Sequence, residues 1–211
     1  MIFARRAVGA LLALALLLAA PPARSQDEAG DADRLVEALA LRPGSVIAEI
    51  GAGDGTLSIA LARRVGSDGH VFTTELGAAR LKTLREKVAA ERVPQIDVLD
   101  GHQTRTNLSD GCCDAVLMRD VYHHFGEPAA MNASLFASLR PGGRVAILDF
   151  APSGEEADTV SGRARDGHHG VGRQTVSREL EAAGFVGIAA TSIAGRRYMV
   201  VAHKPVATPS S

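Results

Sequence analysis

The chain has little of several residue types that mark common classes of protein. Its 211 residues include no Trp, two Tyr, six Phe and two Cys, and the two cysteines, Cys112 and Cys113, are adjacent. Adjacent cysteines cannot close a long loop, so the chain is not a disulfide-framed scaffold. A zinc site would need further ligands at a suitable spacing, and there is no second cysteine pair, so we expect no metal. The pair is expected to be small buried residues at the start of a strand, with a vicinal bridge as the alternative.

An excess of charge of one sign is also lacking. The formal net charge is −1, and the Lys and Arg residues are scattered along the chain. Without a basic stripe, interleaved aromatics or a Trp to stack on a base, nucleic acid is not an expected partner. Hydrophobic residues make up 46% of the chain, which suits a single domain with a sizeable core.

A long uncharged run occurs only near the start of the chain. The Ala/Leu-rich residues 7–20 follow Arg5-Arg6 and precede Ala23-Arg24-Ser25. This charged start, short apolar run and small-residue end predict a signal peptide over residues 1–25 and a periplasmic or secreted mature protein. The run is short of the roughly 20 residues that span a bilayer, so no stable membrane span is expected after cleavage. An inner-membrane anchor formed by residues 7–20 is the alternative, and the flanks of Arg5-Arg6 argue against twin-arginine export.

After the predicted cleavage we expect a flexible lead-in over residues 26–32, one domain over 33–204 and a flexible tail over 205–211. Within the domain, Leu35, Val36 and Leu39 share one face of a helix predicted over 33–41. Residues 152–172 are rich in Gly, Asp, Arg and His and are predicted to form a long loop.

The most informative stretch is a glycine turn between a strand and a helix. An apolar run, 46–50, is followed by Gly51, Gly53 and Gly55 and then by a helix-like run, 57–64. Glycines can adopt positive φ and have no Cβ, so a polar ligand can lie against bare backbone here. Dinucleotide-binding folds also have a glycine fingerprint at this place, but their third glycine would fall at Thr56.

A carboxylate closes the next predicted strand. Residues 70–75 end in Glu75, about 20 residues beyond the turn, which is the offset expected for an acid that holds a ribose. Both signals fall within one βαβ unit, so we expect a nucleoside-bearing ligand at this sheet edge.

Together with later motifs, this pattern resembles the class I S-adenosylmethionine-dependent methyltransferases. The acid-x-Gly-x-Gly-x-Gly turn begins at Glu49, and the resemblance continues through strand-like segments over 94–99 and 114–120. A Leu-Arg-Pro-Gly-Gly turn at 139–143 and an Ala-Gly-Phe turn at 183–185 extend it to roughly residues 33–204. The resemblance implies a doubly wound, mostly parallel, seven-stranded α/β sheet in a single Rossmann-like domain.

The resemblance also implies a cofactor, S-adenosyl-L-methionine, and a set of residues around it. Glu75 would bind the ribose, Asp100 the adenine amino group, and the glycine turn the methionine portion, with Glu49 ordering that turn. The implied cofactor-binding set is Glu49, Gly51, Ala52, Gly53, Glu75, Asp100, Gly101 and Arg119.

Catalytic candidates follow the fourth predicted strand. Asp120, His123 and His124 are the candidate bases or orienting groups, since ligands in open α/β sheets lie beyond the carboxyl ends of the strands. His168 and His169 lie in the long loop and could reach the same cleft. The four histidines could then bind a metal, which is the alternative to the expectation of no metal, but the sequence does not show that they converge.

The expected function is methyl transfer to a small-molecule or lipid-like acceptor. An exported, non-catalytic module that binds an adenosyl ligand is the alternative, because the donor has no obvious source outside the cytoplasm. A nicotinamide oxidoreductase is a third hypothesis, which Thr56 disfavours.

Overall fold

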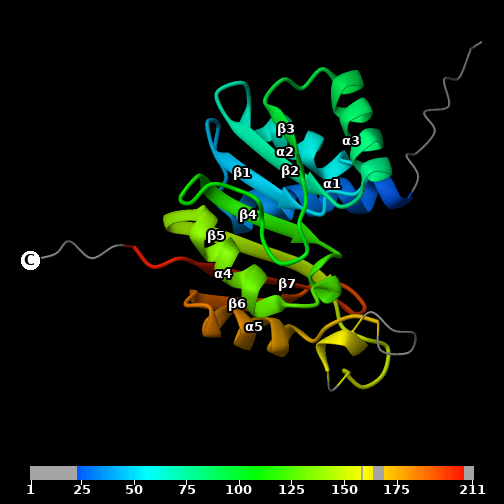
Figure 1. The fold of residues 1–211 in the computed structure, drawn as a ribbon, viewed down its shortest axis with the longest axis vertical. Coiled ribbons are helices and arrows are strands. Elements are labelled where there is room, and N and C mark those ends of the chain that lie inside the picture. The colour runs from blue at the N-terminus through cyan, green and yellow to red at the C-terminus, as the bar shows by residue number, and fades with distance from the viewer. Residues whose placement is uncertain (1–22, 158, 164–168, 207–211) are drawn as a thin grey trace, which may run out of the picture.

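Seven strands form one sheet with helices on both of its faces (Figure 1). The computed structural model describes residues 23–157, 159–163 and 169–206. The strands are β1 (Val46–Ile50), β2 (His70–Glu75), β3 (Ile96–Asp100), β4 (Cys113–Arg119), β5 (Leu139–Phe150), β6 (Val186–Ser192) and β7 (Arg197–His203). The helices are α1 (Ala23–Ala38), α2 (Thr56–Val65), α3 (Ala78–Glu91), α4 (Pro128–Ser138) and α5 (Arg173–Ala182), with short 3-10 turns η1 (Tyr122–His124) and η2 (Val160–Gly162).

The sheet confirms the predicted fold class. The strand order is β3-β2-β1-β4-β5-β7-β6, with β1 to β5 parallel and β7 antiparallel to both β5 and β6. The order reverses between β1 and β4, which places a crevice at the carboxyl ends of these two strands. The first half of the chain builds one side of that crevice and the second half builds the other.

Apolar side chains fill a core on each face of the sheet. Leu35 of α1, Leu57 of α2 and Leu84 of α3 pack on one face, and Met131 of α4 and Leu180 of α5 on the other. All five are fully buried. Strands covered on both faces read as continuous apolar runs, which is why the central strands were visible in the sequence.

The first helix begins well before its predicted start. The sequence predicts a flexible lead-in over 26–32 and a helix from residue 33, whereas α1 starts at Ala23. Asp31 is fully buried and its carboxylate lies 2.7 Å from the Arg197 guanidinium at the start of β7. This contact stabilises the polar first part of the helix. Arg197 is 166 residues from Asp31, so no local sequence pattern predicts the early helix start.

Two further differences lie in the second half of the sheet. The Pro-Gly-Gly turn expected before the fifth strand falls inside β5, where the register with β4 shifts between Cys113 and Ala115. In the described parts of the predicted loop over 152–172, the one helical element is the turn η2.

The N-terminal and C-terminal predictions lie largely outside the described residues. The apolar run at 7–20 and residues 207–211 of the predicted tail belong to this part. In the described part of the chain, no helix has the length and apolar character needed to cross a membrane.

Candidate functional site

A cavity of about 850 Å³ opens at the carboxyl ends of β1, β2 and β4. Its size suits a small-molecule or cofactor ligand. It is lined by Glu49, Ile50, Gly51, Ala52, Gly53, Asp54, Thr74, Glu75, Leu76, Arg80, Gly101, His102, Arg119, Asp120, Val121, His124 and Phe125. Most of the predicted site residues therefore meet at one place.

The glycine turn meets the cavity at Gly53. Its φ is +60°, and a Cβ built at this position would have no heavy atom within 4 Å, so the backbone faces open space. Gly51 also lines the cavity, but a Cβ there would lie 2.7 Å from Val121, so its missing side chain makes room for Val121. Gly55 is not among the lining residues, and a Cβ there would meet Leu84, so the expectation that all three glycines clear space for a ligand is corrected for Gly55.

Glu75 is held in place by backbone amides. Its Oε2 accepts a 2.7 Å hydrogen bond from the Gly53 N–H, and its Oε1 accepts one of 2.7 Å from the Leu76 N–H. The carboxylate is almost fully buried and lies 3.7 Å from the exposed Arg80 guanidinium. A carboxylate fixed at a cavity wall is a strong acceptor for ligand hydroxyls, because charged hydrogen bonds are about twice as strong as neutral ones.

Glu49 lies at the base of the same wall. It is 1% exposed and hydrogen-bonds to Ser58 Oγ, which lies 2.8 Å from Thr73 Oγ1. Burial raises the pKa of Glu49 to about 7, although Ser58 and Arg119 oppose the shift. Its charge state is thus sensitive to any cation that enters the cavity.

Asp100 is not brought to the cavity. Its side chain is 74% exposed and its Oδ1 lies 3.6 Å from the Arg85 guanidinium of α3. The neighbouring Gly101 and His102 line the cavity instead. The predicted contact of the Asp100 carboxylate with a base has no support in this arrangement.

Asp120 follows β4 with a strained backbone. Its φ is +55°, which is uncommon outside glycine, and such outliers often occur at functional sites. Its side chain lines the cavity, and partial burial raises the pKa of the Asp120 carboxyl, with the nearby Arg197 opposing the shift.

The two adjacent histidines of η1 differ in their surroundings. His124 lines the cavity, whereas His123 is 2% exposed and lies beneath the cavity wall. The Nδ1 of His123 lies 2.8 Å from the buried Asp149 carboxylate of β5, which fixes the ring. Burial lowers the pKa of His124, and His123 and His169 lower it further.

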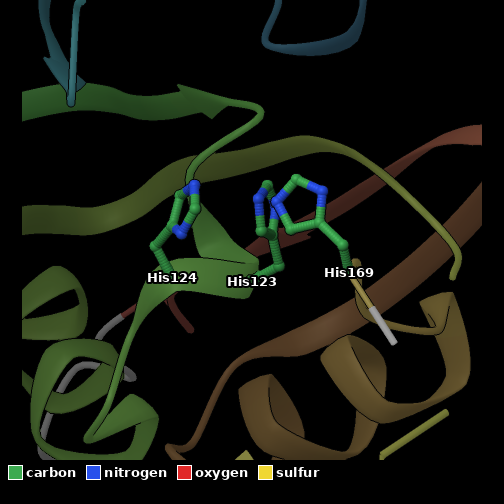
Figure 2. Close-up of side chains that lie close together, drawn as sticks. All are labelled: His123, His124 and His169. Carbon is green, nitrogen blue, oxygen red and sulfur yellow. The ribbon is translucent and has the colours of Figure 1, made fainter. Parts of the chain in front are cut away.

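His169, from the segment after β5, joins this pair (Figure 2). Ring centroids of His123 and His169 are 4.6 Å apart, and those of His124 and His169 are 5.6 Å apart. The sequence indicated that His169 could reach the same cleft as His123 and His124, and the structure brings the three rings together. The other loop histidine, His168, lies outside the described residues.

Sequence reasoning missed several cavity residues, among them Leu76, Arg80, His102 and Phe125. Leu76 follows Glu75 directly and is a large apolar side chain that is 45% exposed. An apolar residue after a strand-ending acid is a signal that could have identified it. His102 and Phe125 directly follow the predicted site residues Gly101 and His124, whereas Arg80 lies in α3 and no motif points to it.

The cysteine pair lies at the opposite end of β4 from the cavity. Cys112 and Cys113 are joined in a vicinal disulfide, where the sequence favoured two small buried residues without a bond. Cys113 is fully buried and opens the strand, as expected.

Comparisons with known proteins agree with the fold. A family described as "Methyltransferase domain" matches residues 47–143, which carry the glycine turn, β2 and β4. A solved structure of a SAM-dependent methyltransferase from Aquifex aeolicus superposes with a TM-score of 0.72 at 20% identity, covering 85% of this chain and 92% of that one. The fold is the Rossmann-like methyltransferase fold. The family match supports S-adenosylmethionine as the cofactor.

Two curated methyltransferases are each similar in sequence to a little more than half of the chain. Arsenite methyltransferase of Halobacterium salinarum is 28% identical over 121 residues, 57% of this chain and 31% of that protein. A ubiquinone/menaquinone biosynthesis C-methyltransferase of a Marinomonas species is 26% identical over 112 residues, 53% of this chain and 45% of that protein. The matched segment thus spans less than half the length of either relative.

The cavity fits an adenosyl ligand on its own geometry. At Gly53 the bare backbone faces space that a side chain would fill, and the fixed Glu75 carboxylate lies beside it. The exposed Leu76 adds an apolar surface next to that carboxylate. A hydroxyl-bearing, partly flat and partly charged molecule is the kind of ligand these groups would hold.

Proposed function

We propose that this protein transfers a methyl group from S-adenosylmethionine to a small-molecule acceptor in the cavity at the ends of β1, β2 and β4. The observation that carries the proposal is the pairing of Gly53 with Glu75. One residue offers open backbone and the other a buried carboxylate, and a 2.7 Å hydrogen bond fixes their relative position.

The cofactor would be held by groups from three strand ends. Glu75 would accept hydrogen bonds from the ribose hydroxyls. The turn at 51–53 would contact the methionine portion, and Leu76 would cover the base. Glu49, with its raised pKa, would become a carboxylate when the amino-acid end of the cofactor brings positive charge nearby. The cofactor supplies an electrophilic methyl group on sulfur.

The acceptor would lie on the side of the cavity formed by Asp120 and His124. Methyl transfer depends mainly on alignment of donor and acceptor, so these side chains would orient the acceptor. An oxygen or nitrogen nucleophile also loses a proton. The raised pKa of Asp120 brings this carboxyl closer to the values that favour proton transfer near neutral pH, whereas the lowered pKa of His124 keeps its ring neutral there.

The relatives support an enzyme over a binding module without turnover. The curated names of both are those of methyltransferases, one for arsenite and one for ubiquinone and menaquinone biosynthesis. Both acceptors are small molecules. We propose an acceptor of this class for this chain and name no individual compound.

Binding of the cofactor tests the proposal first. Purified protein is titrated with S-adenosylmethionine and S-adenosylhomocysteine by calorimetry, with nicotinamide dinucleotide as the matched control ligand. We expect the two adenosyl ligands to bind at one site and the dinucleotide not to bind. Absence of adenosyl binding would refute the proposal, and binding without methyl transfer to any acceptor in a small-molecule panel would favour the binding module.

We further propose that the protein is exported by residues 1–25. The support is the charged start, the short apolar run and the small-residue end of this segment. Fractionation of expressing cells with N-terminal sequencing tests it, and a mature chain beginning near Gln26 outside the cytoplasm is expected. A full-length chain in the inner membrane would indicate an anchor at 7–20, and a full-length cytoplasmic chain would exclude export.

A further inference from the structure

Three imidazole side chains gather at the rim of the cavity, two from η1 and one from the segment after β5. His123, His124 and His169 each offer a ring nitrogen, and these atoms all lie within 4.8 Å of one another. Figure 2 shows the three rings grouped together although His169 is 45 residues from His124 in the sequence. Histidines brought together from distant segments form a potential ligand set for a metal ion.

A second, independent observation points to a ligand at this place. The Nε2 of His123 is buried and has no hydrogen-bond partner. Buried polar atoms are nearly always paired, so an unpaired ring nitrogen inside a histidine cluster suggests that a further group completes it.

The orientation of His123 supports the same conclusion. Its Nδ1 hydrogen-bonds to Asp149 Oδ1 at 2.8 Å, and its backbone N–H donates to Asp149 Oδ2 at 3.2 Å. A proton on Nδ1 leaves the lone pair on Nε2, and metal-binding histidines commonly hold their other nitrogen to a carboxylate in this way. Asp149 is fully buried, so the ring cannot easily turn away.

We propose that His123, His124 and His169 bind one divalent transition-metal ion of the zinc class at the rim of the cavity. Imidazole ligands suit zinc, copper, nickel and iron, whereas calcium and magnesium prefer oxygen. Tetrahedral zinc with nitrogens at about 2.0–2.1 Å requires nitrogens about 3.4 Å apart. His124 and His169 are exposed and can move inward by on the order of 1 Å towards the fixed His123.

Three protein ligands leave one tetrahedral position open. His124 lines the cavity, so the ion would lie beside the place proposed for the acceptor. The open position could hold a water molecule or a donor atom of the acceptor. The proposal departs from the sequence-based expectation of no metal, and it does not depend on methyl transfer.

Metal titration of the full, tag-free protein tests the site. Zn²⁺ is titrated by calorimetry without reductant, and Co²⁺ is followed by the visible absorption that tetrahedral cobalt shows. We expect one ion per chain and displacement of cobalt by zinc. A parent protein that binds no zinc, or binds it with no tetrahedral cobalt signal, would overturn the proposal.

Variants then assign the ligands. His124→Ala and His169→Ala change exposed side chains, so they should fold normally and lose more affinity than the roughly 10- to 100-fold that outer-shell changes cost. Asp149→Asn, which alters the carboxylate behind His123, should fall within that 10- to 100-fold range. The control is His70→Ala, a partly exposed histidine at the start of β2, which should bind zinc like the parent. Equal zinc affinity in His70→Ala, His124→Ala and His169→Ala would show only adventitious binding and refute the assignment.

Discussion

The two sides of the cavity are built in different ways. On the glycine side, Gly53 and Glu75 come from one βαβ unit and are joined by a direct hydrogen bond. On the histidine side, His123, Asp149 and His169 come from β4–η1, β5 and the segment after β5. The first side is a local motif that a sequence can display, and the second exists only when the sheet has formed.

This contrast has a functional meaning. A cofactor shared by many enzymes can be bound by a short local motif, whereas an acceptor site must vary and is assembled from separate segments. The glycine side should therefore bind the donor on its own, without a metal on the histidine side. The predictions below test that separation.

The largest effect is expected at Glu49, the buried acid of the glycine side. Its folded pKa of about 7 exceeds the ordinary value of 4.5, so between these values the folded chain holds more protons than the unfolded chain. Its stabilising contribution is complete below pH 4.5 and is lost as the pH rises through 7, by about 3 kcal/mol. In Glu49→Gln this loss should vanish. Urea unfolding without cofactor from pH 5 to 8 measures the free energy of unfolding. If this free energy changes with pH equally in parent and variant, the pH dependence does not come from Glu49.

Glu75→Ala should weaken cofactor binding by about 1.5 to 3 kcal/mol, roughly ten- to hundredfold, because a charged acceptor is removed. Calorimetry measures the affinity, and circular dichroism checks the fold. Glu86→Ala is the matched control, since Glu86 is an exposed acid of α3 paired with Lys82. Unchanged affinity in Glu75→Ala would mean that the ligand does not use this wall.

A matched pair of glycine variants separates strain from blockage. Gly53 and Gly111 have φ of +60° and +62°, and a Cβ at either would meet nothing within 4 Å, but only Gly53 lines the cavity. Changing either to Ala should cost about 1–2 kcal/mol of stability, because the left-handed region strains a residue with a Cβ. Cofactor affinity should fall about tenfold in Gly53→Ala alone, or about 1.4 kcal/mol. An equal fall in Gly111→Ala would attribute the effect to lost stability.

The smallest effect is expected at Asp100, the acid in register with Glu75 on the neighbouring strand. Its side chain is exposed and paired with Arg85, so Asp100→Ala should change cofactor affinity less than about threefold, or below 1 kcal/mol. The same calorimetric titration measures it. A tenfold loss would restore the role that the family resemblance implies for this acid.

The sequence predicted the local parts of the fold and site well. The alternation of apolar runs with glycine turns located the parallel strands, and Glu75 is the acid that ends β2, as predicted. It also placed Asp120 and His124 at the cavity from the strand they follow. Each of these features depends on residues close together in the chain.

The rest depends on contacts that sequence spacing does not encode. The early start of α1 depends on Asp31 meeting Arg197, and the histidine cluster depends on a fixed His123 meeting a residue of the loop. Asp100 and Glu75 occupy equivalent strand ends, yet the Asp100 side chain is exposed beside Arg85, whereas the Gly53 N–H holds the Glu75 carboxylate at the cavity wall. The sequence correctly predicted an acid at the end of each strand, but the surroundings of each side chain determine whether it reaches the cavity.

The ion pair between α1 and β7 has a consequence for processing of the chain. Asp31 lies five residues beyond Gln26, where the mature chain is proposed to begin, and it is fastened to the last strand through Arg197. A processed N-terminus would therefore stay docked, because Asp31, the first buried residue among those whose burial the structure describes, lies inside the retained segment. Trimming beyond residue 31 would instead leave the Arg197 side of this contact without its carboxylate. Shortening the chain past Asp31 would thus remove the ion pair that joins the first helix to the last strand, and the apolar face of α1, which includes Leu35, would be left to hold the helix.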